Sequence, residues 1–389
     1  MDRYAILNLG FRPFFAGAGL FSIASVLIWL GVYVLDWPWR VQAMPAVIWH
    51  GHEMIFGYGM AVVAGFLLTA VKNWTGVQTL HGLPLLLLFL LWLAARILLL
   101  GGAAVPLEWA AAADCLFDLL LLIAIACPVF RVRQFRQAGI LAKVALLLFS
   151  NMAFYAGMLN ILPGAVRPAL YSGVYLILAL IFVMSRRVLP FFIERGLEHP
   201  VSLKNSKRID AAGLFVFLGF WIADVLTPDS RLVGLLAGVL CVLHAIRLGG
   251  WYAAGIMQRP LLWVLYLAYA VIVAGFALKA AVVPAGVSPA LALHAFTYGG
   301  IGLFTLGMMA RVTLGHTGRN ILDPPPVSAW IFGALLAGTV LRVLLPLVDP
   351  QHYTLWIALS QLLWLAVFSA FLAVYLPMLV RPRVDGQFG

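Results

Sequence analysis

Twelve apolar stretches, each long enough to cross a lipid bilayer, restrict this chain to one class of fold. A membrane-spanning helix needs about 20 largely apolar residues, and such stretches recur between short breaks containing charged residues, proline or glycine. They are predicted over residues 14–35, 46–71, 83–101, 106–127, 140–162, 169–190, 210–227, 231–250, 261–283, 289–314, 328–348 and 353–379. We therefore expect an all-α fold, a polytopic membrane helix bundle forming a single transmembrane domain over residues 1–389, with its longest polar loop near residues 191–209.

The composition excludes the main classes of soluble protein. The chain is 64% hydrophobic and 10% charged, whereas a soluble domain has roughly 45–50% apolar and about 25% charged residues. Membrane lipids are therefore the expected surroundings, and nucleic acid is not an expected partner despite the net charge of +11. The three cysteines, Cys115, Cys127 and Cys241, lie in apolar stretches and form neither a disulfide framework nor a CxxC metal site.

Basic residues are distributed unevenly between the predicted loops, which indicates the orientation of the chain. Lys and Arg collect in cytoplasmic loops. If the N-terminus is cytoplasmic, most of the 25 Lys and Arg residues fall on that side, Arg3 among them. The other side keeps only Arg40, Arg96, Arg167, Arg231, Lys279 and Arg342. Both termini are therefore predicted to be cytoplasmic.

The densest group of polar residues inside a span is WHGHEMIFG, residues 49–57, which places His50, His52 and Glu53 in the first turns of the second span. Ionisable residues within a span are costly and by default indicate a functional site. Residues two apart on a regular helix point about 200° away from each other, so His50 and His52 cannot both bind one metal ion. The alternative is that these are polar residues near the interface, hydrogen-bonded to their neighbours.

A third histidine occupies a matching place in the tenth span. His294 follows Pro289 by five residues, as His50 follows Pro45. Both spans run inward in the predicted topology, so at 1.5 Å per residue both histidines lie roughly 8 Å below the outer boundary. A haem iron can take an imidazole on each face. The pattern therefore predicts that His294 and one histidine of the second span hold a haem, of b type.

Two registers favour different partners for His294. The spacing from His52 to Gly57 repeats that from His294 to Gly299, which favours His52, whereas the depth match favours His50. The remaining histidine is then expected to serve a second haem or metal on the opposite helix face. The glycines allow either a flat ring or another helix to approach the backbone closely.

The acidic residues of the spans are candidate proton carriers. Glu53 is predicted to act catalytically, as a proton carrier or as the hydrogen-bond acceptor that orients a histidine ligand. Asp114 and Asp118 are four residues apart and share one helix face. They are expected either to line a proton path or to pair with Arg96.

A second set of polar residues is predicted at the cytoplasmic ends of four segments. Arginine side chains match carboxylates and phosphates, so such a ring can hold haem propionates, a phosphate or a quinol headgroup. The alternative is that they are ordinary positive-inside residues. The set comprises Arg12, Lys72, Arg187, Arg311, His316 and Arg319.

Several of these segments together resemble the NnrS family of bacterial membrane proteins. They are FRPFF (11–15), WHGHEMIFG (49–57), GFLLTAVKNWTG (65–76), RRVLPFF (186–192), HAFTYGGIG (294–302) and RVTLGHTGR (311–319). The resemblance covers almost the whole chain. It implies a haem- and copper-containing protein of the bacterial inner membrane, associated with denitrification and nitric-oxide stress. This sequence shows no separate three-histidine copper site.

Three kinds of function remain open at this point. The resemblance favours a haem protein that acts on nitric oxide. As an oxidoreductase it would reduce nitric oxide with electrons from quinol or an electron-donor protein. The second is a twelve-helix transporter, in which the charged residues would form gates or ion sites. The third is a non-catalytic protein that binds nitric oxide or a metal.

Overall fold

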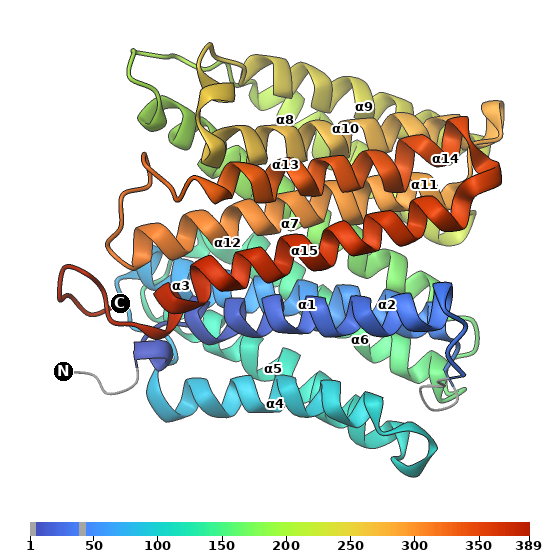
Figure 1. Cartoon of the computed structure of the whole chain (residues 1–389), viewed down its shortest axis with the longest axis horizontal. Coiled ribbons are helices and arrows are strands. Elements are labelled where there is room, and N and C mark those ends of the chain that lie inside the picture. Colours follow the sequence, from blue (N-terminus) through green and yellow to red (C-terminus); the bar gives the residue numbers. More distant parts are fainter. Residues whose placement is uncertain (1–4, 39–43) are drawn as a thin grey trace. The chain divides into compact units, whose positions relative to one another are not determined.

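The computed structural model describes residues 5–38 and 44–389. Within them, twelve helices are long and apolar enough to cross a membrane, and they correspond one by one to the twelve predicted spans. The prediction of a multi-pass, all-α membrane protein is therefore confirmed (Figure 1). Arg3 and Arg40, which entered the topology prediction, lie outside the described residues.

Nine spans are formed by one helix each, and three are interrupted by a π-helical turn. The single helices are α1 (Phe11–Val34), α4 (Gly82–Leu100), α5 (Leu107–Arg131), α6 (Ala138–Met158), α7 (Val166–Gly196), α8 (Lys207–Leu226), α9 (Arg231–Gly250), α10 (Pro260–Ala285) and α15 (Tyr353–Val380). Span 2 consists of α2 (Ala46–His52), η2 (Glu53–Gly59) and α3 (Met60–Thr75). Span 10 consists of α11 (Pro289–His294), η6 (Ala295–Ile301) and α12 (Gly302–His316), and span 11 of α13 (Val327–Thr339), η7 (Val340–Leu344) and α14 (Leu345–Val348).

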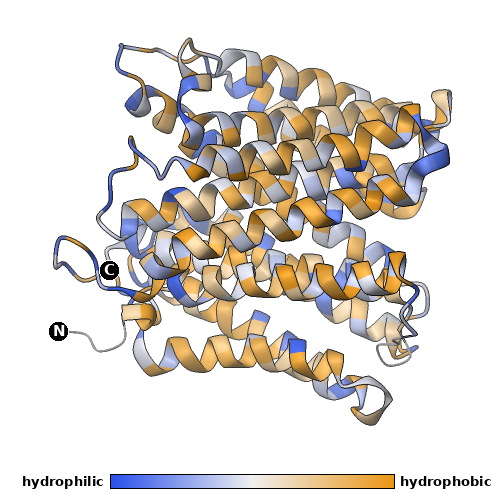
Figure 2. Ribbon diagram, viewed as in Figure 1, coloured by the Kyte–Doolittle hydropathy of each residue, from blue (hydrophilic) through white to orange (hydrophobic). Residues whose placement is uncertain are grey.

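The helices are apolar on most of their circumference, as helices surrounded by lipid and by one another must be. Hydrophobic residues cover the ribbons in Figure 2, and the polar residues within them are isolated. Helix ends follow ordinary capping rules: Ser206 and Ser230 accept hydrogen bonds from the backbone at the starts of α8 and α9. The loop predicted from residue 191 begins later, because α7 continues through Pro190 to Gly196.

The contacts divide the chain into two compact units. Unit 1 comprises residues 1–176, 309–320 and 368–389, and unit 2 comprises residues 177–308 and 321–367. In unit 1, α1 packs on η2 and α3, and α5 packs on α4 and α6. In unit 2, α10 packs on α9, α11 and η6, and α8 packs on α9.

Span 2 and span 10 are the two most enclosed of the twelve. Of their most apolar windows, 83% and 78% of the residues are buried, against 61% or less in every other span found in the described chain. These are the spans that carry His52 and His294. The structure thus places both histidine-bearing segments inside protein rather than against lipid.

Candidate functional site

Both histidine-bearing segments change from α-helix to π-helix directly after the histidine. His52 is the last residue of α2 and His294 the last residue of α11. The π-helical segments that follow, η2 and η6, have seven residues each. A π-helical turn inside an α-helix is uncommon and is frequent at functional sites. The register that matched His52 to His294 in the sequence therefore has a counterpart in the backbone.

The correspondence between spans 2 and 10 extends along their length. A Cβ atom on Gly57 would lie 2.5 Å from Phe21 of α1, and one on Gly299 would lie 2.5 Å from Val271 of α10. Each glycine therefore lets its span approach the preceding span closely. The two segments also end alike, since the glycines that follow them, Gly76 and Gly318, both have positive φ (69° and 75°).

His52 is completely buried and both of its ring nitrogens face acceptor oxygens. Its Nδ1 lies 2.9 Å from Oε1 of Glu53, and its Nε2 lies 3.0 Å from Oδ1 of Asn151. The amide of Asn151 donates to Asp118 at 2.9 Å, which turns its oxygen toward the histidine. The ring also stacks on Phe154, with centroids 4.3 Å apart. Only the imidazolium form of His52 can donate to both acceptors.

Glu53 belongs to a buried group of charged residues in unit 1. Arg96 of α4 donates to Oε1 of Glu53 at 2.5 Å and forms an ion pair with Asp114 of α5. The hydroxyl of Tyr155 on α6 donates to Asp114 at 3.0 Å. The predicted pairing of the α5 aspartates with Arg96 is therefore present for Asp114. We call His52, Glu53, Arg96, Asp114, Asp118, Asn151 and Tyr155 the unit 1 ion cluster.

His294 lies in a different setting, within unit 2. Its Nδ1 lies 2.7 Å from the carbonyl oxygen of Ala290, to which it donates. Its Nε2 lies 2.8 Å from Nη2 of Arg342, a buried residue of η7. A guanidinium can only donate hydrogen bonds, so Nε2 must accept. His294 is therefore neutral, with its proton on Nδ1 and a lone pair on Nε2.

His50 faces a third environment. It is half-buried, and its ring lies flat on the indole of Trp29 in α1, with centroids 4.5 Å apart and planes inclined by 4°. His52 instead contacts Asn151 and Phe154 of α6. The two histidines thus contact different helices, as their spacing of two residues predicts.

The predicted basic ring is assembled in part. Arg12 is buried, and its Nη1 donates to the backbone carbonyls of Met378, Leu379 and Arg381, at 3.2, 2.6 and 2.8 Å, so it caps the end of α15. Lys72 lies over the ring of Phe388 at 4.8 Å. Five of the six residues belong to unit 1, and the exception is the exposed Arg187 of unit 2.

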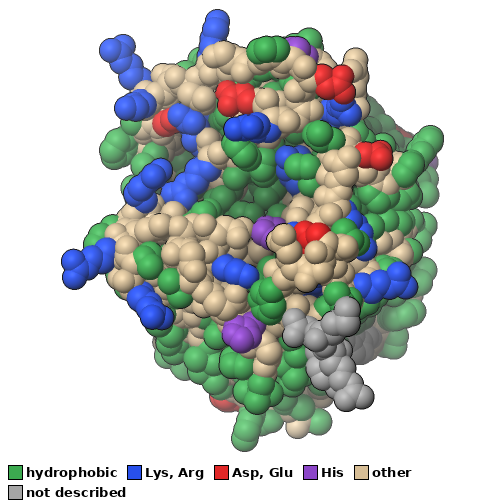
Figure 3. All heavy atoms as spheres, turned by 90° about the vertical axis from the view of Figure 1, so that its left-hand side faces the viewer, with side chains coloured by type: hydrophobic (Ala, Val, Ile, Leu, Met, Phe, Trp, Pro, Cys, Tyr) green, Lys and Arg blue, Asp and Glu red, His purple; other side chains and the backbone are tan. Residues whose placement is uncertain are grey.

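The ends of α12 and α15 in unit 1 bring further basic residues next to this set. Nε2 of His316 is 3.5 Å from the side-chain amide of Asn73, and Arg383 donates to the backbone carbonyl of His316 at 3.2 Å. The pKa of Arg319 is lowered by burial and by the nearby charge of Arg381. Arg311 is buried in α12. Figure 3 views this end of the helices and shows Lys and Arg as the commonest charged side chains on it.

Sequence reasoning missed the residues that distinguish His52 from His294. Asn151, Phe154 and Tyr155 are polar or aromatic residues of an otherwise apolar span, and nothing in the sequence connects them with span 2. Arg342 entered the topology prediction only as one of the few basic residues on the outer side. Its place inside an apolar stretch was the signal that could have marked it as a site residue.

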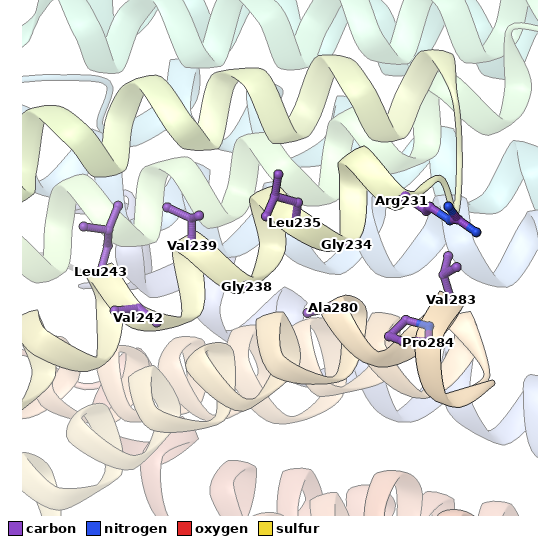
Figure 4. A pocket seen from close by; sticks show the side chains of 10 residues that line it. All are labelled: Arg231, Gly234, Leu235, Gly238, Val239, Val242, Leu243, Ala280, Val283 and Pro284. Carbon is purple, nitrogen blue, oxygen red and sulfur yellow. The ribbon is translucent and has the colours of Figure 1, made fainter.

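Two further features lie apart from these residues. Within the described part of the chain, no group of three or more His, Cys, Asp or Glu side chains is placed to hold a metal ion. An apolar cavity of about 820 Å³ lies between α9 and α10, with Arg231 at one end (Figure 4). None of the predicted site residues lines this cavity.

The model of one protein family, described as NnrS protein, matches residues 5–383. The chain belongs to the NnrS family. The resemblance noted in the sequence is thereby confirmed over nearly the whole chain. Membership of the NnrS family is consistent with a membrane protein related to nitric oxide. No curated protein sequence matches the chain.

Proposed function

We propose that this protein binds haem in the bacterial inner membrane and acts on nitric oxide, with His294 and His50 as iron ligands. Its membership of the NnrS family and its twelve apolar helices support a nitric-oxide-related membrane protein. The hydrogen bonding of His294 supports the haem part of the proposal. It is the single observation that distinguishes a ligand from an ordinary buried histidine.

His294 has the form that an iron ligand requires. A histidine that ligates a metal is neutral at the ligating nitrogen and usually donates its other N–H to a backbone carbonyl or a carboxylate. Nδ1 of His294 donates to Ala290 in this way, and its Nε2 keeps a lone pair. Arg342, which now donates to that lone pair, is suited to pair with a haem propionate, since guanidinium groups match carboxylates.

His50 fits the second ligand position better than His52. Both ring nitrogens of His52 already contact side-chain oxygens, Oε1 of Glu53 and Oδ1 of Asn151, so neither is free to face a metal. Its ring is also packed between Phe56 of η2 and Phe154 of α6, with centroids 5.1 and 4.3 Å away. His50 is half-buried beside Trp29 and matches the depth of His294 relative to its proline. We therefore assign the ligand role to His50 and a role within the unit 1 ion cluster to His52.

Haem would supply an iron that binds nitric oxide and passes an electron to it. Reduction of two nitric oxide molecules to nitrous oxide and water consumes two electrons and two protons. Glu53 and its neighbours in the unit 1 ion cluster would hold protons for this reaction. Electrons would come from quinol or an electron-donor protein. The basic residues Arg311, His316 and Arg319, in and just after the last turns of α12, would bind an anionic group. We include no copper site in the proposal.

The visible spectrum of the purified protein tests the proposal directly. We expect a Soret band with sharp reduced α and β bands, and a shift of these bands on addition of nitric oxide. His294→Ala and His50→Ala should each lower the haem content or convert the iron to the high-spin form. Loss of haem in only one of the two variants would assign the iron to that histidine, whereas partial loss in both would indicate that each histidine holds an iron of its own.

Two exposed histidines provide matched controls. His81→Ala and His352→Ala should leave both haem content and spin state unchanged. A colourless but folded protein would contradict the proposal and favour a transporter. Wild-type spectra from both His294→Ala and His50→Ala would place the iron elsewhere. Nitric oxide consumption at an electrode, with a reductant present, separates turnover from binding.

A further inference from the structure

The unit 1 ion cluster contains more buried acids than cations. Glu53, Asp114 and Asp118 are each at most 1% exposed, and so is Arg96. Arg96 contacts Glu53 and Asp114, one through each terminal nitrogen. Among the residues that the structure describes, Asp118 forms no ion pair with a cation of this cluster. The positive charge of Arg96 is therefore already shared by two of the three acids.

Asp118 has one weak partner and one unoccupied oxygen. Its Oδ2 accepts a hydrogen bond from the neutral amide of Asn151 at 2.9 Å. Its Oδ1 is buried and has no hydrogen-bond partner among the residues that the structure describes. A neutral amide stabilises a buried carboxylate far less than an ion pair does. Of the three acids, Asp118 is thus the one whose charge is least compensated.

The other titratable groups around α5 do not change this result. On α5 itself, Asp114 lies one turn away and adds negative charge. From α6, Tyr155 donates its hydroxyl to Asp114, and the half-buried Lys143 donates to the carbonyl of Gly139 on its own helix. The adjoining α3 carries only Lys72, which lies over Phe388.

The unit 1 ion cluster has fewer cations than carboxylates whether His52 is charged or neutral, so a bound proton is needed to reduce its negative charge. With His52 charged, two cations face three carboxylates, and with His52 neutral, one cation faces three. An isolated charged carboxylate in a low-dielectric interior is so costly that such a group becomes neutral instead. We propose that Asp118 is an exchangeable proton-binding site, carboxylate plus proton in equilibrium with carboxylic acid. The neutral acid removes the uncompensated charge.

This site is independent of haem and of nitric oxide. It rests on the burial and contacts of Asp118, and it would operate equally in an enzyme, a binding protein or a transporter. If the protein proves colourless, the proposed function fails and the proton site is unaffected. If Asp118 proves ionised, the proton site fails and the haem assignment to His294 and His50 is unaffected.

Infrared spectroscopy of the full-length protein in lipid tests the protonation of Asp118. A protonated carboxyl group has a carbonyl stretching band that is absent from carboxylates and that shifts in D2O. We expect the wild-type protein to show such a band at neutral pH and to lose it reversibly at alkaline pH. Asp118→Asn should remove the band, and Asp118→Glu, which keeps an acid, should restore it at a shifted position.

Asp224 provides the matched control in unit 2. It is equally buried, but Nζ of Lys279 lies 2.7 Å from it, so it has a cation of its own. Asp224→Asn should leave the band unchanged. An unaltered band in Asp118→Asn, or no band in wild type at neutral pH, would overturn the proposal. So would a band that disappears when sodium is added at constant pH, since the site would then bind a metal cation. Should Asp118→Asn fail to fold, the D2O shift and the Asp118→Glu variant still decide the assignment.

Discussion

His52 and His294 occupy the same position in two similar helical segments but have opposite hydrogen-bonding partners. Each ends an α-helix and precedes a π-helical segment of seven residues. Both nitrogens of His52 contact side-chain oxygens, whereas His294 donates from one nitrogen to a carbonyl and accepts from Arg342 at the other. The same backbone arrangement therefore places one histidine beside carboxylates in unit 1 and the other beside an arginine in unit 2.

The arginine of the following span accounts for much of this difference. In unit 1 the residue after His52 is the acid Glu53. Arg96 contacts Glu53 rather than the histidine, and His52 contacts Glu53 as well. In unit 2, the residue after His294 is Ala295, so Arg342 contacts the histidine itself. A single difference, an acid at residue 53 and alanine at residue 295, thus goes with the change in the histidine's partner from a carboxylate to a guanidinium. Each of the following experiments tests one part of this contrast.

Removal of Arg96 is expected to have the largest effect on stability. Arg96→Met would leave Glu53 and Asp114 buried without their guanidinium, and breaking a buried ion pair from one side costs about 3–5 kcal/mol. We expect a large fall in the thermal unfolding midpoint in detergent. The loss should lessen at acid pH, where protonation of the acids removes the uncompensated charge.

Arg342→Met is the matched variant in unit 2. The partner that it leaves behind, His294, is already neutral, so the expected cost is that of a hydrogen bond, about 1 kcal/mol. Its pH dependence should resemble that of the wild type. Equal losses from the two arginine variants would mean that the two histidine environments do not differ in charge as the contacts indicate.

The matched glycines should respond alike, with an intermediate effect. A Cβ atom on Gly57 would lie 2.5 Å from Phe21, and one on Gly299 would lie 2.5 Å from Val271 and 2.6 Å from Thr339. Alanine at either position must displace these side chains, and overpacking of this kind costs about 1–3 kcal/mol. Thermal unfolding of Gly57→Ala and Gly299→Ala measures the loss.

Gly333 in α13 is the control for the glycine variants. A Cβ atom there meets nothing within 4 Å, so Gly333→Ala should be neutral or slightly stabilising, since alanine favours helix. A loss confined to one of Gly57→Ala and Gly299→Ala would show that the two segments pack differently against the preceding span. The structural correspondence between spans 2 and 10 would then be limited to the backbone.

The spans could be predicted from the sequence because lipid imposes a strong and local rule. About 20 apolar residues in a row suffice to predict a span, and all twelve were found this way. The continuation of α7 through Pro190 was missed because proline and nearby charges normally indicate a helix end. Neighbouring packing stabilises such helices in membrane proteins in spite of the lost hydrogen bond.

The site was predictable as a set of residues but not as a set of environments. The polar residues of span 2 stand out in an apolar sequence, so His50, His52 and Glu53 were identified directly. The roles of His52 and His294 depend on Asn151 and Arg342, which come from other spans. Contacts between distant spans have no period or spacing in the sequence, and so the preference for His52 as the partner of His294 had only a five-residue register behind it.

An exposed ion pair provides the smallest expected effect and a limit for the comparison. Arg383 donates to Asp385 through Nε at 2.9 Å and through Nη2 at 2.5 Å, and these hydrogen bonds lower the pKa of Asp385 to about 2. Because the pKa of this carboxyl lies below its usual value of 3.8, the ion pair stabilises the folded segment fully above pH 3.8. This stabilisation is lost as the pH falls toward 2 and Asp385 is protonated. Because exposed pairs are screened by water, Asp385→Asn should leave the thermal unfolding midpoint unchanged at neutral pH.

We expect only the C-terminal segment to respond to the loss of this ion pair. Arg383 also holds that segment to the helix α12 through its hydrogen bond to the carbonyl of His316. Cleavage of this segment by pepsin, followed by mass spectrometry, should accelerate as the wild-type protein is acidified from about pH 4 to pH 2. In Asp385→Asn it should be fast throughout that range. A fall in the unfolding midpoint as large as that of Arg96→Met would show that burial is not what makes the unit 1 ion cluster important.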